Sequence, residues 1–132
     1  MKNIITLFAF AITLFATTSC SKDNDIIPAN NNTSYTVLLK VISKSDPVKP
    51  NTVINYNDEN SIEQLISTGS FEKSFTVKKG YTAFLRAKGT IINGSLKYQL
   101  LITQGDNVIK DISTELNGTD LNFDINKSYT IN

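Results

Sequence analysis

Short runs of alternating apolar and polar side chains fill the chain from residue 34 onward and constrain its fold most strongly. The clearest runs span residues 71–77, 81–87 and 96–102, with apolar side chains mainly at every second position. Alternation with a period of two is typical of half-buried β-strands. We therefore predict an all-β domain over residues 34–132, an antiparallel, immunoglobulin-like β-sandwich of about seven or eight short strands.

Turn-forming residues separate these runs at intervals typical of hairpins. Asn93-Gly94 and Asn117-Gly118 are the strongest signals, because both residue types tolerate positive φ. The Gly105 segment predicts a further turn. The sequence does not reveal the order of the strands in the sheet.

One segment fits two local structures equally well. Ile62, Leu65 and Ile66 have the spacing of a single helical turn, and they also fit a ragged strand. No amphipathic stretch of 10–15 residues separates the strands, which argues against a parallel α/β sheet.

Composition removes several classes of function. The 132 residues include 13 Lys and Arg against 12 Asp and Glu, no His, no Trp and a single Cys. This balanced charge argues against nucleic-acid binding, which needs a basic surface for phosphates. Without His, a Ser-His-Asp or Cys-His catalytic centre is excluded. The lone Cys excludes internal disulfides, and we expect neither a cofactor nor a metal.

The first twenty residues have the pattern of an export signal that ends at this cysteine. A basic start is followed by an apolar run over residues 4–16, too short to span a membrane, and then by small residues up to Cys20. The pattern resembles the lipobox of bacterial lipoproteins, in the looser form of the Bacteroidetes type. The resemblance implies a signal peptide over residues 1–19 and acyl chains (a diacylglycerol on the Cys20 thiol and a fatty acid such as palmitate on its amine). An ordinary signal peptide with an incidental Cys is the alternative.

The residues after Cys20 indicate where the protein goes. Ser21, Lys22, Asp23 and Asp25 resemble the surface-export signal of Bacteroidetes lipoproteins. Residues 20–33 are polar and read as a lipidated tether. The resemblance implies an outer-membrane lipoprotein exposed at the cell surface, with retention on the periplasmic leaflet as the alternative.

A second resemblance covers about half of the mature chain. The order of motifs in residues 52–56, 70–77, 80–87, 96–102 and 105–111 is similar to that of the MmpS family, whose members are accessory proteins of mycobacterial lipid exporters. This resemblance implies a small β-sandwich and an accessory role in transport. The chain departs from that family in carrying a lipobox leader in place of a membrane helix.

Two features invite a chemical interpretation. Asp58 and Glu59 form the densest acidic loop, which fits either a Ca²⁺ loop or, as we favour, a solvated turn. Lys73 lies at a position that the alternation assigns to the apolar side of its strand. It is either a nucleophile with a lowered pKa or, as we favour, a lysine at the margin of the sheet whose amine reaches water.

Phe84, Arg86 and Lys88 share one parity of a predicted strand and form the candidate binding face. Such a face suits anionic headgroups, an acidic glycan or an acidic protein. A solvated sheet face is the simpler interpretation of the charges. Phe84 is either covered by a second layer or available as a contact residue.

Taken together, the sequence predicts a lipid-anchored, non-enzymatic module that binds or assists a cell-envelope complex. A surface module for glycans or small ligands is the second hypothesis. A structural or inhibitory role, in which an edge strand or loop engages a protein, is the third.

The Cys20→Ala substitution tests the anchor. We expect the variant to leave the membrane fraction, because each buried methylene of an acyl chain contributes about 0.8 kcal/mol to membrane attachment. Cell fractionation with immunoblotting measures this, and Thr6→Ala, in the apolar run of the same leader, is the matched control. Unchanged fractionation of Cys20→Ala contradicts lipidation.

Overall fold

The computed structural model describes residues 33–45 and 52–132. The predicted leader, Cys20 and the export residues Ser21, Lys22, Asp23 and Asp25 lie outside the described residues. Within the described residues, no helix is long and apolar enough to cross a membrane.

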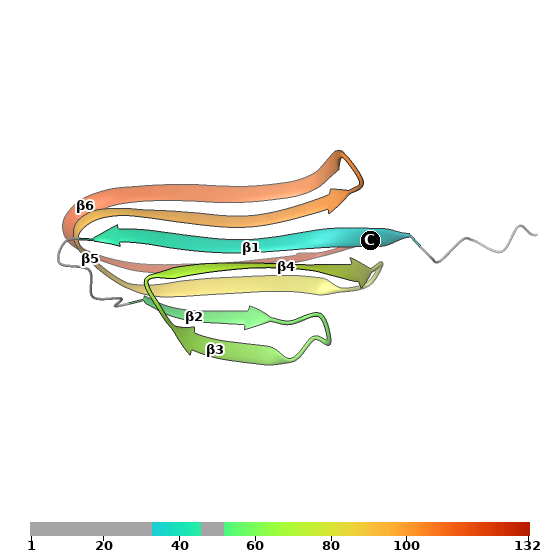
Figure 1. Cartoon of the computed structure of the whole chain (residues 1–132), viewed down its shortest axis with the longest axis horizontal. Helices are drawn as coiled ribbons and strands as arrows, with labels where there is room; N and C mark the ends of the chain where they lie inside the picture. Colours follow the sequence, from blue (N-terminus) through green and yellow to red (C-terminus); the bar gives the residue numbers. More distant parts are fainter. Residues whose placement is uncertain (1–32, 46–51) are drawn as a thin grey trace, which may run out of the picture.

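The described part of the chain is all-β, which confirms the predicted fold class. Its strands are antiparallel and form one curled sheet that folds into two layers (Figure 1). The six strands are β1 (Ser34–Ser45), β2 (Thr52–Asn57), β3 (Glu63–Ser67), β4 (Ser70–Lys78), β5 (Thr82–Gln104) and β6 (Asn107–Thr130).

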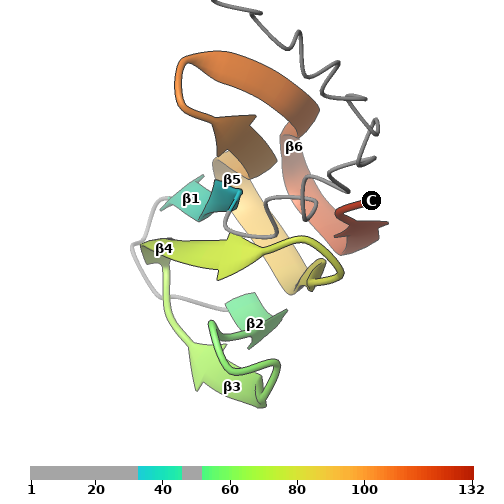
Figure 2. The same cartoon turned by 90° about the vertical axis from the view of Figure 1, so that its right-hand side faces the viewer.

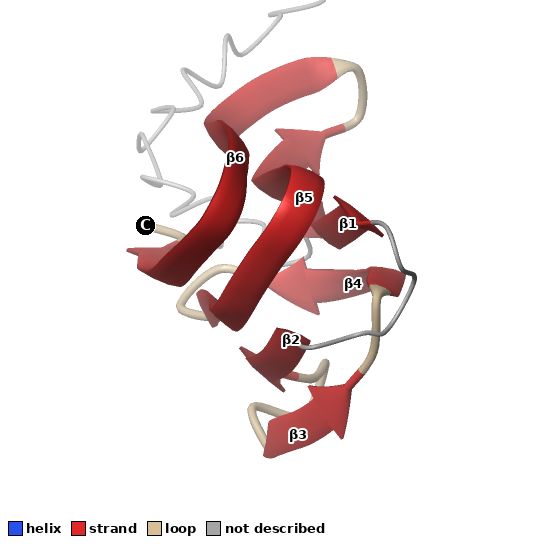
Figure 3. Cartoon of the chain, turned by 90° about the vertical axis from the view of Figure 1, so that its left-hand side faces the viewer, coloured by secondary structure: helices blue, strands red, loops and turns tan. Residues whose placement is uncertain are grey.

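The long hairpin of β5 and β6 organises both layers. Strand β6 pairs with β5 along its whole length, from Thr82↔Thr130 to Gln104↔Asn107. The other edge of β5 pairs first with β2 and then with β1, which gives the order β3-β2-β5-β1-β4. One layer therefore contains β4, β1 and the second half of β5, and the other contains β3, β2 and the first half. Figures 2 and 3 show β5 and β6 curving together from one layer into the other.

The two Asn-Gly pairs do not form hairpin turns, so that prediction is wrong. Gly94 pairs with Gly118 inside the β5–β6 ladder, at the bend between the layers. Glycine suits such a corner, because a Cβ on Gly118 would lie 3.1 Å from the Cβ of Leu121, and Gly94 has a φ of 149°. Since both predicted turns lie within continuous strands, the described residues form six strands rather than seven or eight.

Other turns lie where the sequence predicts them. Gly105, with a φ of 56°, sits in the tight turn between β5 and β6, and Gly80, with a φ of 90°, sits between β4 and β5. Residues 62–66 lead into and form strand β3, so the helical alternative is wrong. The alternation places Ile66 against the core and leaves Leu65 in solvent.

The core fills the space between the two layers and comes from the inward parity of each strand. Its fully buried apolar side chains are Val37, Leu39, Val41, Ile54, Ala83, Leu85, Ala87, Ile91, Leu96, Leu100 and Ile102. Tyr98, which is also buried, donates a hydrogen bond from its hydroxyl to the Leu85 carbonyl at 2.6 Å. This bond ties the second half of β5 to its own first half. Burial raises the pKa of Tyr98, which keeps the hydroxyl protonated as a donor.

The Tyr98→Phe substitution tests the contribution of this hydrogen bond to stability. We expect the free energy of unfolding to fall by about 1–2 kcal/mol, because a core hydrogen bond is lost while the ring stays packed. Denaturant titration measures the change. Tyr35→Phe is the control, a buried tyrosine whose hydroxyl has no hydrogen bond within the described residues. If both variants lose the same free energy of unfolding, the hydrogen bond from Tyr98 to Leu85 has no specific role in stability.

Candidate functional site

The structure brings the three predicted face residues together on the surface. Phe84, Arg86 and Lys88 point outward from the first half of β5, while Leu85 and Ala87 between them point inward and are fully buried. Phe84 and Arg86 are half-buried, and Lys88 is exposed. All three side chains therefore reach solvent on the same side of the molecule.

Arg86 has a partner that the sequence did not indicate. Its guanidinium binds both carboxylate oxygens of Asp124 on β6, with Nε–Oδ1 at 2.8 Å and Nη2–Oδ2 at 2.6 Å. This fork-shaped hydrogen bonding lowers the pKa of Asp124 and raises that of Arg86. The pair is neutral as a unit, so Arg86 is not a free anion receptor, and Lys88 remains as the exposed cation beside it.

Exposed apolar side chains from the neighbouring strands extend this surface. Val53 on β2 lies opposite Lys88, while Leu65 on β3 and Arg86 flank Asn55 from its two sides. Val53 is 40% exposed and Leu65 is 67% exposed. We call the surface formed by Val53, Leu65, Phe84, Arg86 and Lys88 the β2–β5 face.

Val53 and Leu65 were missed by the sequence analysis. The signal for Val53 was its parity, because it alternates with the buried Ile54 and Tyr56 and must point the other way. Leu65 carries the same signal only once residues 63–67 are assigned as a strand. Because the sequence fits a helical turn equally well there, the outward position of Leu65 could not be predicted.

A shallow hollow lies beside the β2–β5 face. It has a volume of about 380 Å³ and is lined by Lys88, Gly89, Thr90, Asn122, Phe123 and Asp124. Gly89 pairs with Phe123 across the β5–β6 ladder and has no side chain to fill the surface there. The Thr90 hydroxyl donates to the Asn122 side-chain oxygen at 2.6 Å, which closes one margin of the hollow.

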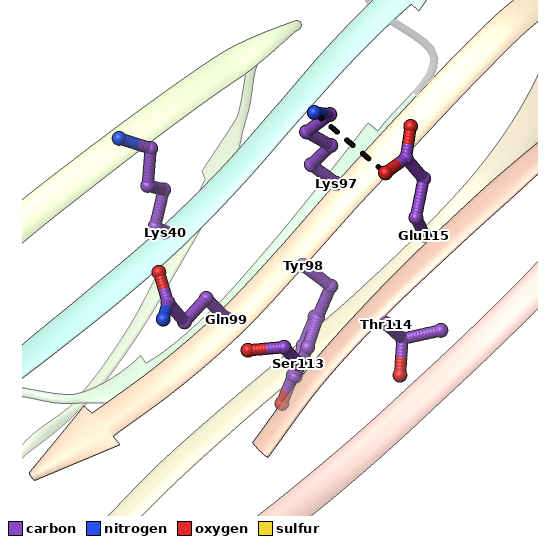
Figure 4. A pocket seen from close by; sticks show the side chains of 7 residues that line it. All are labelled: Lys40, Lys97, Tyr98, Gln99, Ser113, Thr114 and Glu115. Carbon is purple, nitrogen blue, oxygen red and sulfur yellow. Dashed lines mark ion pairs between the residues drawn. The ribbon is translucent and has the colours of Figure 1, made fainter. Parts of the chain in front are cut away.

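A second hollow, of about 280 Å³, lies on the outward face of the other layer (Figure 4). The residues that line it all carry a polar group at the end of the side chain, and they are Lys40, Lys97, Tyr98, Gln99, Ser113, Thr114 and Glu115. Most of these groups already have partners. Lys97 pairs with Glu115 at 3.6 Å, and Lys40 pairs with Glu72 at 2.8 Å.

Gln99 completes the polar surface of this second hollow. Its amide nitrogen donates to Asp111 at 3.2 Å, and the Ser113 hydroxyl donates to the same carboxylate. The hollow therefore presents amide, hydroxyl and charged groups on a nearly flat sheet. The candidate binding face predicted from the sequence includes none of these side chains.

Lys73 acts as a packing and pairing residue at the margin of the sheet. Its amine lies 3.1 Å from Glu59 Oε2 and 5.4 Å from the centre of the Tyr56 ring. The hydrogen bond to Glu59 raises the pKa of Lys73. A lysine nucleophile needs a lowered pKa, so this geometry contradicts the nucleophile interpretation and agrees with a marginal lysine that keeps its charge.

The acidic turn at Asp58 organises its own backbone. Asp58 Oδ1 accepts hydrogen bonds from the backbone N–H groups of Asn60 and Ile62, both at 2.9 Å, and Oδ2 accepts one from the Gln64 amide at 3.0 Å. These bonds, led by that from Ile62, lower the pKa of Asp58. Within the described residues, no group of three or more His, Cys, Asp and Glu side chains is placed to hold a metal ion.

No protein-family model matches the sequence, and no curated protein matches it. The resemblances to bacterial lipoproteins and to the MmpS family therefore stay predictions.

The Asp58→Asn substitution tests the charge of the turn. Because folding lowers the pKa of Asp58, its ionised form stabilises the fold above the unfolded pKa of about 4, and this contribution is lost as pH falls through the folded pKa. Asparagine keeps the Oδ1 acceptor without the charge. We therefore expect the variant to be less stable at pH 7 and to lose less stability on acidification than the unmodified protein.

Urea unfolding at a series of pH values measures this difference. Asp106→Asn, at an exposed carboxylate in the turn between β5 and β6, is the matched control and should keep the original pH dependence. If Asp58→Asn also keeps the original pH dependence, the charge of the turn has no role in stability.

Proposed function

We propose that this chain is a lipid-anchored, non-enzymatic module of the outer membrane that binds a partner protein of a cell-envelope complex. The β2–β5 face is the docking surface. The single observation that carries this proposal is the exposure of Leu65 and Val53, which are neighbours on β3 and β2, on the same sheet face as Phe84. Anchoring rests on the leader and on Cys20.

The composition of the β2–β5 face favours a protein over a small anion. Apolar side chains bordered by charged groups are typical of interfaces, in which the apolar centre supplies affinity and the charged rim supplies orientation. Arg86 is held in place by Asp124, so its ordering costs little on binding. The exposed Lys88 favours a partner with acidic groups at the corresponding position.

The resemblance to the MmpS family also supports an accessory role in a cell-envelope complex. Members of that family assist exporters of envelope lipids, and this chain has a comparable order of strands and turns in residues 52–111. A comparable role here is that of an accessory subunit on the surface of a larger transport complex.

A second candidate function is glycan binding at the hollow of Figure 4. Gln99, Ser113 and Glu115 present an amide, a hydroxyl and a carboxylate on one sheet face, and these groups suit sugar hydroxyls. Sugar rings usually stack on aromatic side chains, however, and the chain has no Trp. The apolar content of the β2–β5 face therefore makes protein binding the leading proposal.

Site-specific photo-crosslinking in intact cells tests the leading proposal. A photoreactive amino acid at position 65 of the full chain should give a discrete crosslink to one envelope protein. The same amino acid at position 115, on the outward face of the other layer, is the matched control and should give none. A Leu65→Lys variant probed from position 53 should lose the crosslink, because a central apolar contact contributes about 2 kcal/mol, or roughly 30-fold in affinity.

Three results bear against protein binding through the β2–β5 face. These are crosslinks of equal yield from positions 65 and 115, no crosslink from position 65, and an unchanged crosslink in the Leu65→Lys variant. Binding of the purified protein to a glycan array, lost in Gln99→Ala and retained in Leu65→Lys, supports the second candidate instead. Turnover of a substrate from a hydrolase panel contradicts the non-enzymatic role.

A further inference from the structure

One end of the sandwich is set apart by where the chain enters it. Ser34, the first residue of β1, pairs with Lys78 at the end of β4, and Thr36 pairs with Thr103 near the end of β5. The beginning of β1 therefore lies between the β4–β5 turn and the β5–β6 turn. Because β1 begins here, we call this end of the molecule the tether end (Figure 1).

The tether end carries exposed apolar side chains directly after the β5–β6 turn. Val108 is 63% exposed and Ile109 is 38% exposed. Lys110 follows, and its amine lies 5.7 Å from the centre of the Tyr129 ring. Adjacent aliphatic, lysine and tyrosine side chains are the composition that suits the boundary between lipid and water, where apolar groups bury and amines reach headgroups.

The β4–β5 turn at the tether end carries two exposed cations. Lys78 and Lys79 are exposed in the β4–β5 turn and form no ion pair within the described residues. Of the nearby acids, Glu59 is paired with Lys73, and the carboxylate of Asp58 is hydrogen-bonded within its own turn. Asp106 is the exposed acid of the β5–β6 turn. Lys78 and Lys79 therefore form an exposed pair of cations in the β4–β5 turn, which favours an anionic surface.

We propose that the tether end docks on the lipid surface that holds the anchor. Val108 and Ile109 insert between the headgroups, while Lys78 and Lys79 contact the phosphate groups of anionic lipids. This inference rests on the proposed anchoring at Cys20 and adds a defined orientation of the domain on the membrane.

Because the anchor already holds the domain near the membrane, a weak contact with lipid is sufficient to orient it. Twelve residues lie between Cys20 and Thr33, and a chain of this length spans at most about 45 Å when fully extended. A tethered surface meets its partner at high effective concentration, so two apolar side chains and two lysines can hold an orientation that they would not hold from free solution.

Fluorescence quenching on vesicles tests the docking. The full lipidated protein is reconstituted in vesicles of phosphatidylethanolamine and phosphatidylglycerol that contain a lipid-borne quencher. Because Cys20 is the only cysteine and carries the lipid, an introduced cysteine is a unique labelling site. We compare Ile109→Cys with Leu121→Cys, which has a similar exposure (38% and 37%) but lies at the bend at the opposite end of the sandwich. We expect quenching at position 109 and none at position 121.

Charge reversal separates docking from random contact. Lys78→Glu combined with Lys79→Glu should lower the ratio of docked to undocked protein by at least about tenfold, because each lysine near an anionic surface contributes a factor of roughly five. Lys44→Glu combined with Lys88→Glu has the same change in charge away from the tether end and should leave the quenching unchanged.

The outcomes distinguish docking from anchoring. Equal quenching at positions 109 and 121, or no quenching at either while the protein floats with the vesicles, overturns the docking proposal and leaves the anchor intact. Unchanged quenching in the Lys78 and Lys79 double variant also overturns it. If the protein does not float with the vesicles at all, the anchor itself is refuted, and docking falls with it.

Discussion

The fold depends on one paired ribbon that bends back on itself. Strands β5 and β6 stay hydrogen-bonded through the bend, so both layers of the sandwich share the same two strands. The hydroxyl of Tyr98 reaches across the core to the carbonyl of Leu85 and fixes how closely the two halves approach. Because β1 and β2 then pair with successive halves of β5, this bend determines which residues face outward on each layer.

The open edges of the sheet explain why we place binding on a face. Strands β3, β4 and β6 each have an unpaired edge, which is prone to pair with other chains. Two of these strands, β4 and β6, carry an inward-pointing lysine over an aromatic ring: Lys73 over Tyr56 and Lys110 over Tyr129. A buried strand added at either edge would desolvate that amine, which opposes edge-to-edge pairing. These lysines weaken the hypothesis of an edge-strand partner at β4 and β6, whereas β3 contributes Leu65 to the β2–β5 face.

The sequence predicted parity well and connectivity poorly. Alternation alone identified the all-β class and the shared face of Phe84, Arg86 and Lys88, because the period of a strand is local. It misread Asn93-Gly94, since a hairpin turn and a corner within a strand both favour a residue without a Cβ. The pairing of Arg86 with Asp124 was hidden because it joins residues 38 positions apart through a register that no local pattern reveals.

Orientation links the two proposed surfaces. If the tether end rests on the membrane, the long strands rise away from the lipid, because the β4–β5 and β5–β6 turns both lie at that end. The β2–β5 face then points sideways along the membrane plane rather than outward into solution. A partner embedded in the same membrane would meet Leu65 and Val53 directly, so docking by lipid contacts would present this face to neighbouring envelope proteins.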